Sequence, residues 1–259
     1  MICLPLAKSV IDREFFEDYN KMKNYLYSKL HELPFEVGGI FEYYAHTFPI
    51  DANRNECALR FLESDCDISI WLDTDQTFQR ETLFNLVKHD LPIVAGMYYA
   101  KAEPFYPIVF KESPDSDNFS LFNPIIRHPE NELFEADMMG MGCVAIKKEV
   151  FKKLEYPYFR YSPHPKNSNS PDMEWKYSHK INDVSEDVYF FKQIRQAGIK
   201  VIVDPKIQCG HLTKITIDKS LFDSYLATSC MEFEKRHGKE AFQKLWEGQC
   251  QAEPLKKQS

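Results

Sequence analysis

The stretch Asp65-Cys-Asp-Ile-Ser-Ile-Trp-Leu-Asp-Thr-Asp75 decides the fold predicted for this chain. Its middle part, residues 68–72, is a short apolar run with two isoleucines and a tryptophan, which is typical of a buried strand. Asp73 and Asp75 follow where the run ends, and residues two apart in an extended segment face the same side. Open α/β sheets bind ligands at the carboxyl ends of their strands, so both carboxylates are placed to reach one ligand. Such a pair suits a hard divalent cation, which completes its shell with water and substrate phosphate.

The same spacing of two aspartates occurs at two other places, so the pattern alone is weak evidence for a metal site. One copy, Asp65 and Asp67, stands at the opposite end of the same apolar run, where solvated turn acids are the ordinary interpretation. Another lies within Ser113-Pro-Asp-Ser-Asp-Asn118, a composition that favours a surface turn. Only the copy that ends at Asp75 closes an apolar strand, and that context singles it out.

The composition predicts one large α/β domain with a C-terminal extension. The chain has 259 residues, of which 44% are hydrophobic and 27% charged, which is enough apolar material for a sizeable core. We expect the main domain to span residues 1–218 and a helical extension to span residues 219–259. No apolar run approaches the roughly 20 residues that cross a membrane. The seven cysteines form no C-x-x-C pair and no signal-peptide pattern is present, which favours a reducing cytoplasm.

Apolar periodicity predicts strands and helices in alternation along the chain. Strands are expected at residues 2–10, 35–44, 68–72, 92–99 and 199–203, with a glycine-bearing turn that feeds a strand at 136–147. Helices are expected at residues 12–30, 50–63, 80–88, 149–154, 188–197 and 222–244. Strand, acidic turn, helix and strand in succession form a βαβ unit, which favours parallel pairing. The expected fold class is therefore α/β, with a mostly parallel sheet flanked by helices and a C-terminal helical tail.

Two further polar segments are expected at the same edge of the sheet. Ser185-Glu-Asp187 opens a helix, and His211 follows the strand at 199–203. Each also has an ordinary structural interpretation, because a serine suits the N-cap, acids suit the positive end of a helix dipole, and a lone histidine is more often structural than a ligand. Their coincidence with Asp73 and Asp75 at the ends of successive elements favours a shared site.

Four more residues near this edge are candidates, and three of them have two interpretations each. Arg54 lies in the first turn of the helix at 50–63, where a cation opposes the helix dipole. It is either the partner of an anion or an ordinary surface arginine. Lys101 follows the strand at 92–99, at the ligand-binding edge. Gly140 and Gly142 indicate either a tight turn or a close approach of the backbone to a ligand.

Taken in order, the motifs of this chain resemble a known protein family over nearly its whole length. The matching segments are Ala52-Asn-Arg-Asn55, Trp71-Leu-Asp-Thr-Asp75, Ile93-Val-Ala-Gly-Met-Tyr98, Met139-Gly-Met-Gly-Cys143, Ser185-Glu-Asp-Val-Tyr-Phe190, Asp204-Pro205 and Gly210-His211. They resemble the nucleotide-sugar-dependent glycosyltransferases of the GT-A fold, especially small bacterial and phage members of the family-2 type. The resemblance implies a Rossmann-like GT-A sheet and a UDP-sugar donor.

The resemblance also implies a role for each candidate residue. Asp73 and Asp75 look like the DxD pair, with Asp75 as the direct ligand of Mn²⁺ or Mg²⁺. His211 resembles the late histidine that completes the metal site. Asp187, with its neighbour Glu186, resembles the catalytic base of inverting members. Donor-binding roles are implied for Arg54 near the nucleotide diphosphate, and for Asp73, Lys101, Gly140 and Gly142.

Glycosyl transfer fits the chemistry of this set. A divalent cation neutralises the leaving diphosphate, and a base deprotonates the acceptor hydroxyl. A carboxylate at a helix N-terminus is expected to have a lowered pKa, so that Asp187 is ionised at neutral pH. Paired carboxylates with a histidine would also serve a metal-dependent phosphodiesterase or nuclease. A non-catalytic sugar-nucleotide binder on the same fold is a further alternative.

The segment 156–184 has no clear period and is expected to be a loop on the acceptor side. Phe159 and Trp175 are candidate surfaces for stacking a base, and Arg160 is a candidate phosphate contact. Small chains of this pattern resemble phage DNA-modifying transferases, which favours a hydroxymethylated pyrimidine in phage DNA as acceptor, within the host cytoplasm. The net charge of −7 weighs against DNA, and an envelope glycan or lipid-linked sugar is the alternative acceptor. The sequence leaves the sugar and the oligomeric state open.

Overall fold

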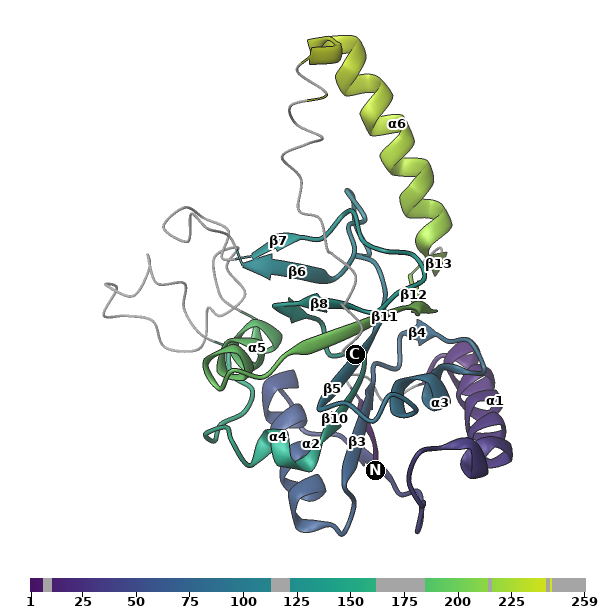
Figure 1. The fold of residues 1–259 in the computed structure, drawn as a ribbon, viewed down its shortest axis with the longest axis vertical. Helices are drawn as coiled ribbons and strands as arrows, with labels where there is room; N and C mark the ends of the chain where they lie inside the picture. The colour runs from purple at the N-terminus through teal and green to yellow at the C-terminus, as the bar shows by residue number, and fades with distance from the viewer. Residues whose placement is uncertain (7–10, 113–121, 162–184, 214–215, 241–242, 244–259) are drawn as a thin grey trace, which may run out of the picture.

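A seven-stranded mixed sheet lies at the centre of the computed structural model, which describes residues 1–6, 11–112, 122–161, 185–213, 216–240 and 243 (Figure 1). The strands are β1 (Ile2–Pro5), β2 (Glu42–Ala45), β3 (Ile68–Leu72), β4 (Gln76–Thr77), β5 (Ile93–Met97), β6 (Val109–Glu112), β7 (Phe122–Pro124), β8 (Phe134–Ala136), β9 (Met138–Met139), β10 (Cys143–Lys147), β11 (Val201–Gln208), β12 (Gly210–Leu212) and β13 (Thr216–Ile217). The helices are α1 (Arg13–Lys29), η1 (Leu30–Glu32), α2 (Ile50–Glu63), α3 (Thr82–Val87), α4 (Lys148–Phe151), α5 (Glu186–Gln196) and α6 (Lys219–His237).

The main sheet has the strand order β2-β1-β3-β10-β5-β11-β8. Five of its strands run in one direction, because β1 pairs in parallel with β2 and β3, β11 pairs in parallel with β5, and β10 lies antiparallel between β3 and β5. Strand β8 is also antiparallel. The mostly parallel α/β sheet expected from the sequence is therefore confirmed. The antiparallel β10 places the turn before Cys143 beside the carboxyl end of β3, because Cys143 pairs with Leu72.

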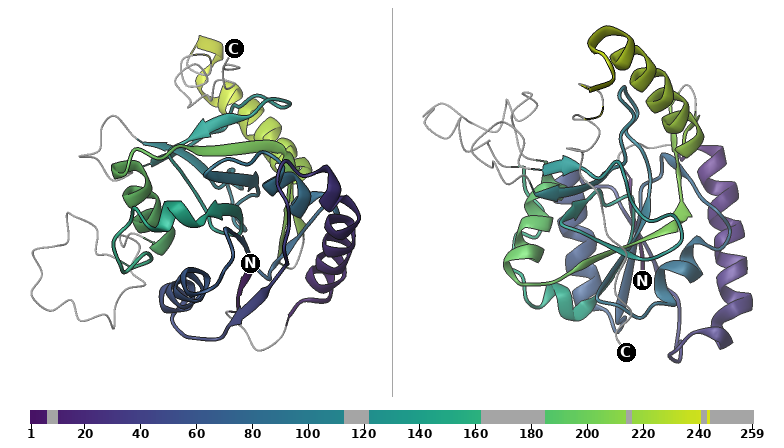
Figure 2. Two further views of the ribbon diagram at one scale, coloured as in Figure 1. Left: turned by 60° about the horizontal axis from the view of Figure 1, so that its bottom comes forward. Right: turned by 45° about the horizontal axis from the view of Figure 1, so that its top comes forward.

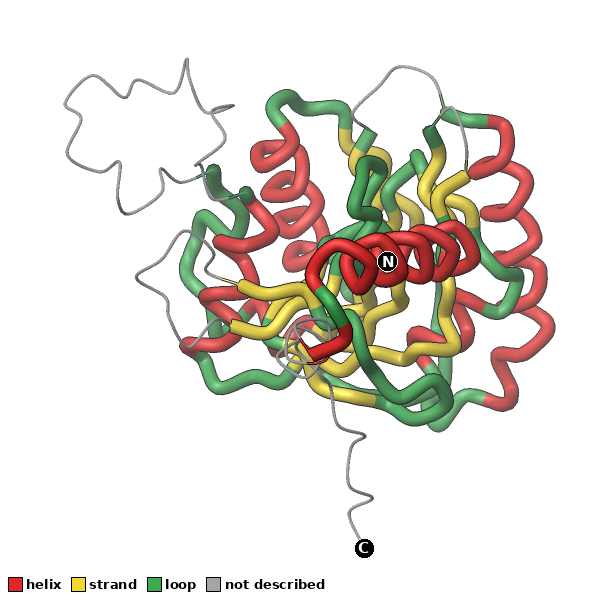
Figure 3. The backbone as a smooth tube through the Cα atoms, turned by 90° about the horizontal axis from the view of Figure 1, so that it is seen from above, coloured by secondary structure: helices red, strands yellow, loops and turns green. Residues whose placement is uncertain are grey.

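Helices cover both faces of the sheet and form two apolar clusters with it. Helices α1 and α3 pack on one face, and helices α2, α4 and α5 pack on the other (Figures 2 and 3). Strand β3 serves both clusters, since Ile70 and Leu72 point to the first face and Trp71 to the second. The Trp71 indole is fully buried and donates a hydrogen bond from Nε1 to Ser69 Oγ at 3.0 Å. The acidic end of β3 is thus carried by a strand that is fixed on both sides.

Several expected elements differ from those observed. The strand expected at 35–44 begins only at Glu42, and two three-stranded sheets, β13-β12-β4 and β7-β6-β9, were not expected. Their strands have two to four residues, which is too short to show a period-2 pattern in sequence. The last helix begins at Lys219, three residues before the expected start, because the Asp218 side chain accepts from Leu221 N at 2.9 Å and caps it.

The segment after α4 is fixed to α2 as far as it is described. Asn55 Nδ2 donates to Phe159 O at 2.6 Å, and Asn55 Oδ1 accepts from the backbone N–H groups of Tyr158 and Phe159. Gln193 of α5 donates to the carbonyl groups of Pro157 and Tyr158. The expected loop at 156–184 is therefore tightly held over residues 156–161, and its remainder lies outside the described residues.

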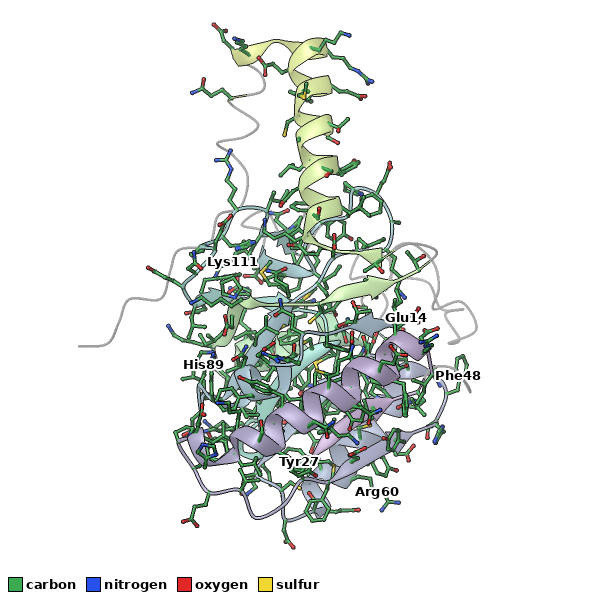
Figure 4. All side chains as sticks on the ribbon, turned by 90° about the vertical axis from the view of Figure 1, so that its right-hand side faces the viewer. Glu14, Tyr27, Phe48, Arg60, His89 and Lys111 are labelled. Carbon is green, nitrogen blue, oxygen red and sulfur yellow. The ribbon has the colours of Figure 1, made fainter. Side chains whose placement is uncertain are left out.

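Helix α6 projects beyond the sheets, as Figures 1 and 4 show. Its first turns are anchored by aromatic contacts, because Phe222 stacks on Tyr99 with ring centroids 5.2 Å apart and Tyr225 meets Phe105 edge to face. Further along, Met231 is 72% exposed. The division into a domain 1–218 and an extension 219–259 stays a prediction. Across the described ranges, no helix combines the length and the apolar character that crossing a membrane requires.

The aromatic cluster under α5 should dominate local stability. Phe190 is fully buried and stacks on Phe159 with centroids 4.7 Å apart. We expect Phe190→Ala to lower the free energy of unfolding by about 3–5 kcal/mol, through lost burial and the cavity left behind. Phe16→Ala is the matched control, because Phe16 is 58% exposed and should change it by no more than about 0.5 kcal/mol. Urea titration of both variants measures the difference, and equal effects would contradict this account of the core.

Candidate active site

The carboxyl end of β3 meets the turn before β10 at the edge of the sheet. The backbone N–H of Asp73 donates to Gly142 O at 3.0 Å. A Cβ atom at Gly142 would overlap the Gln76 side chain and lie 2.9 Å from Asp73 Oδ2. A Cβ atom at Gly140 would likewise overlap the Tyr98 hydroxyl. Both glycines are therefore required by packing against this chain's own side chains.

Arg54 of α2 lies among three carboxylates from two other segments. Its Nη2 donates to Asp73 Oδ1 at 3.4 Å. Its Nε lies 3.4 Å from Glu186 Oε1, and its Nη1 lies 3.2 Å from Asp187 Oδ1. The Arg54 side chain is only 5% exposed. Of the two interpretations of Arg54, the surface arginine is excluded by its burial, and the anions that it meets are acids of the protein itself.

Glu186 and Asp187 reach this cluster because α5 begins there. The Ser185 hydroxyl oxygen accepts from Val188 N at 3.4 Å, so the expected N-cap is confirmed. The second oxygen of Asp187 accepts from Met141 N at 3.3 Å, which ties α5 to the glycine-bearing turn. The ends of β3 and α5 therefore lie side by side, as the sequence predicted for Asp73 and Asp187.

The pKa of Asp187 shifts in the direction opposite to that expected. Burial raises the pKa of Asp187 well above the ordinary range, although the charge of Arg54 lowers it, and the negative charge of Glu186 raises it further. Burial also raises the pKa of Asp73, again against the lowering effect of Arg54. The expectation of a lowered pKa was wrong because it considered the helix terminus alone and could not include desolvation.

Asp75 lies apart from Arg54 and faces Lys101 and His211. Lys101 Nζ donates to Asp75 Oδ2, and His211 Nε2 lies 3.8 Å from Asp75 Oδ1. The other ring nitrogen of His211 is hydrogen-bonded to Tyr99 O at 2.8 Å, which orients Nε2 toward Asp75. Burial lowers the pKa of His211, so the neutral, ligand-competent ring is favoured.

These residues fit a divalent cation in part. Asp75 and His211 offer an oxygen and an imidazole nitrogen that face one another, and the Nδ1 contact is the kind that orients a metal-binding histidine. Asp73, the third expected ligand, is turned to Arg54. Within the described ranges, no group of three or more His, Cys, Asp or Glu side chains is arranged to hold a metal ion. The three expected ligands stand at one edge without forming a complete coordination shell.

Two of the expected acceptor contacts can be located. Phe159 is 1% exposed and packs between Trp71 and Phe190, so its proposed role in stacking a base is corrected: the ring belongs to the core. Arg160 is exposed and lines a groove of about 790 Å³ together with Leu59 and Tyr156. Trp175 lies outside the described residues.

Sequence reasoning missed two buried polar residues in this region. Tyr98 accepts from Gly142 N through its hydroxyl oxygen at 3.2 Å, and its ring meets His211 edge to face. Gln76 is fully buried next to Asp73, and neither atom of its amide has a hydrogen-bond partner among the described residues. An aromatic residue after a strand and a glutamine after an acidic turn carry no distinguishing pattern, so neither could have been identified from sequence.

Comparisons with known proteins give matches at the level of structure only. No protein-family description and no curated protein matches the sequence. Among solved structures, A197 from STIV matches with a TM-score of 0.47 and 18% identity over 82% of this chain and 84% of that one. GalNAc-T7, solved with UDP, GalNAc and Mn²⁺, matches with a TM-score of 0.45 and 15% identity over 82% of this chain. The chain covers only 37% of GalNAc-T7.

The raised pKa of Asp187 predicts a pH-dependent cost in stability. Because its folded pKa exceeds the unfolded value of about 3.9, the folded state holds a proton that the unfolded state releases, and stability is lost as pH rises toward the folded pKa. Asp187→Asn removes the buried charge, so its Tm should exceed that of the wild type at neutral pH and approach it near about pH 4. Each 1 kcal/mol would appear as a shift of about 2–4 °C.

Thermal melts across this pH range, followed by circular dichroism, measure the effect. The exposed Asp65→Asn is the matched control and should melt with the wild type at every pH. A lower Tm for Asp187→Asn at neutral pH would show that the ion pair with Arg54 outweighs the cost of burial.

Proposed function

We propose that this chain is a metal-dependent, inverting glycosyltransferase that moves a sugar from a UDP-sugar to an acceptor hydroxyl. The observation that carries the proposal is the division of the acids at one sheet edge into two groups. Asp75 faces His211 at the more open position, with its side chain 33% exposed. Asp187 lies against Arg54 with its side chain 19% exposed. One group suits a cation and its diphosphate, and the other suits a proton acceptor.

Asp187 supports the proposal as the catalytic base. The acceptor oxygen would attack the anomeric carbon, its proton would pass to the Asp187 carboxylate, and the bond from that carbon to the diphosphate oxygen would break. The nucleoside diphosphate would leave with the bonding electrons, which inverts the configuration at the sugar. Burial raises the pKa of Asp187 to about 8, so its ionised carboxylate is a stronger base than an ordinary one. Within the described residues, Asp187 Oδ1 makes no hydrogen bond, and it lies 3.2 Å from Arg54 Nη1.

Asp75, His211 and Lys101 support binding of the diphosphate. Asp75 and His211 are the residues that would hold Mn²⁺ or Mg²⁺, which when bound supplies charge neutralisation for the leaving diphosphate. The Lys101 ammonium lies against Asp75 with its side chain 37% exposed, so it can also contact a phosphate oxygen. Both features fit the donor roles that the sequence resemblance implies for these positions.

The arrangement is less suited to a nuclease. Two-metal phosphodiesterases hold paired ions about 3.5–4 Å apart between shared carboxylates. Here the position between Asp73, Glu186 and Asp187 is taken by the Arg54 guanidinium. A non-catalytic binder of UDP-sugar is separated from an enzyme by experiment, since it would bind the donor without releasing UDP.

Two acceptor classes follow from the proposal. A hydroxymethylated pyrimidine in phage DNA is the acceptor that the sequence resemblance favours, and an envelope glycan or lipid-linked sugar is the alternative. The groove beside Arg160 favours the alternative, because Asp51, Glu56 and Glu63 line it as well as Arg60. A groove with more acids than bases repels a polyanion.

Removal of Asp75 should abolish metal-dependent turnover. In an assay of UDP release from a UDP-sugar panel with Mn²⁺, Asp75→Ala should lose about 100-fold or more, because metal stabilisation of the leaving group is worth several kcal/mol. Asp67→Ala is the control, since Asp67 lies exposed at the opposite end of the same strand. Asp187→Asn should still bind donor and lose about 10²–10⁴ in transfer. Full turnover in EDTA, or by Asp75→Ala, would contradict the metal assignment.

The two acceptor classes differ in their response to salt. Transfer to hydroxymethylated duplex DNA should weaken steeply as salt rises, because phosphate contacts release counterions. Transfer to a neutral saccharide should be nearly unchanged over the same range. Labelled UDP-sugar offered to hydroxymethylated DNA, unmodified DNA and an oligosaccharide panel decides between them. Label on neither DNA, with label on a saccharide, would end the DNA hypothesis.

A further inference from the structure

Arg54 has surroundings that do not match the donor-binding role implied by sequence resemblance. All three of its guanidinium nitrogens lie within 3.4 Å of a carboxylate oxygen of the protein. Its side chain is 5% exposed, whereas those of Asp73 and Asp187 are 24% and 19% exposed. The acids thus stand between the guanidinium and the solvent-facing part of the site.

Moving Arg54 out to a ligand would be costly. The guanidinium is the positive charge that faces Asp73, Glu186 and Asp187 at once. Its departure would leave buried carboxylates without compensation, which is strongly destabilising in proteins. A phosphate that approached from outside would also meet the carboxylates first, and like charges repel. The ion pairs with these three acids therefore hold Arg54 in place.

The acids come from elements that have no backbone hydrogen bonds to one another. Asp73 directly follows β3, and Asp187 lies in the first turn of α5. Arg54 lies on α2, 19 residues before Asp73 in the chain. A planar guanidinium offers donors in several fixed directions, so one side chain can set the separation of both acids.

We propose that Arg54 is a positioning residue, which fixes the base Asp187 relative to Asp73 at the donor site, and is not a ligand of the donor diphosphate. The proposal rests on the glycosyltransferase function inferred above. Substitution of Arg54 should therefore change kcat and leave the affinity for the diphosphate unchanged. Arg54 Nη1 and Asp187 Oδ1 face each other at 3.2 Å without hydrogen-bond geometry, so no hydrogen bond from Arg54 competes with a proton at that oxygen.

The test compares Arg54→Lys with Arg13→Lys. Arg13 lies at the start of α1, pairs with Glu17 and is 85% exposed. A lysine keeps the charge but cannot place three nitrogens against three separate acids. We expect Arg54→Lys to lower kcat by about 100-fold, the cost of a small misplacement of reacting groups. Arg13→Lys should keep the wild-type kcat.

Binding separates positioning from phosphate recognition. Calorimetry with UDP and with uridine gives the affinity that the diphosphate adds. We expect the ratio of the two affinities to be the same in Arg54→Lys as in the wild type, with the loss confined to kcat. A fall in UDP affinity with uridine affinity unchanged would overturn the proposal and make Arg54 a diphosphate ligand. Unchanged kcat would overturn it as well.

A second variant guards against misfolding. In Arg54→Ala, guanidinium ion at millimolar concentration, well below denaturing levels, should restore part of the lost kcat by entering the vacated space, and methylammonium should restore less. Failure of both ions to rescue a variant whose circular dichroism matches the wild type would count against positioning. Wild-type protein that binds no UDP would instead remove the glycosyltransferase function, and with it this inference. That outcome is distinct from a change seen only in the Arg54 variants.

Discussion

One buried positive charge, that of Arg54, offsets the repulsion among the acids at the edge of the sheet. Asp73, Glu186 and Asp187 would repel one another if they were brought together without compensation, and the Arg54 guanidinium lies within 3.4 Å of all three. The strand that precedes Asp73, the helix that begins with Glu186 and the helix that carries Arg54 can therefore meet at one point. Burial raises the pKa of both Asp73 and Asp187, and the negative charge of Glu186 raises both further.

The elements that were predictable are those whose pattern is local. The strand at 68–72 and the N-cap at Ser185 were both identified from short stretches, because an apolar run and a capping serine need no distant partner to be recognised. The direction of β10 was not predictable, since a strand has the same apolar pattern whichever way its neighbours run. Strands such as β4 and β12 pair over two residues and exist only because tertiary contacts bring them together.

The site was predictable in its place and less so in its chemistry. Acids at the ends of neighbouring elements had to lie near one another by the geometry of an open sheet. The sequence pattern does not show which side chains are buried, and burial determines the chemistry of the site. It reverses the expected pKa shift of Asp187, draws Phe159 into the core, and turns Arg54 inward to protein acids. Each of these depends on residues more than 80 positions away in the chain.

Asn55, which follows Arg54 directly on α2, has a consequence of its own. Its amide hydrogen-bonds to the backbone of residues 158–159, as a neighbouring strand would. The amide oxygen accepts from two N–H groups, and the amide nitrogen donates to one carbonyl group. A single turn of helix thus supports the charged centre with one residue and the outer segment with the next. A ligand that displaced the outer segment would act on the same helix turn that carries Arg54, and any coupling between the two sites would be equal in both directions. Helix α2 therefore carries both the residue that holds the charged centre, Arg54, and the residue that holds the outer segment, Asn55.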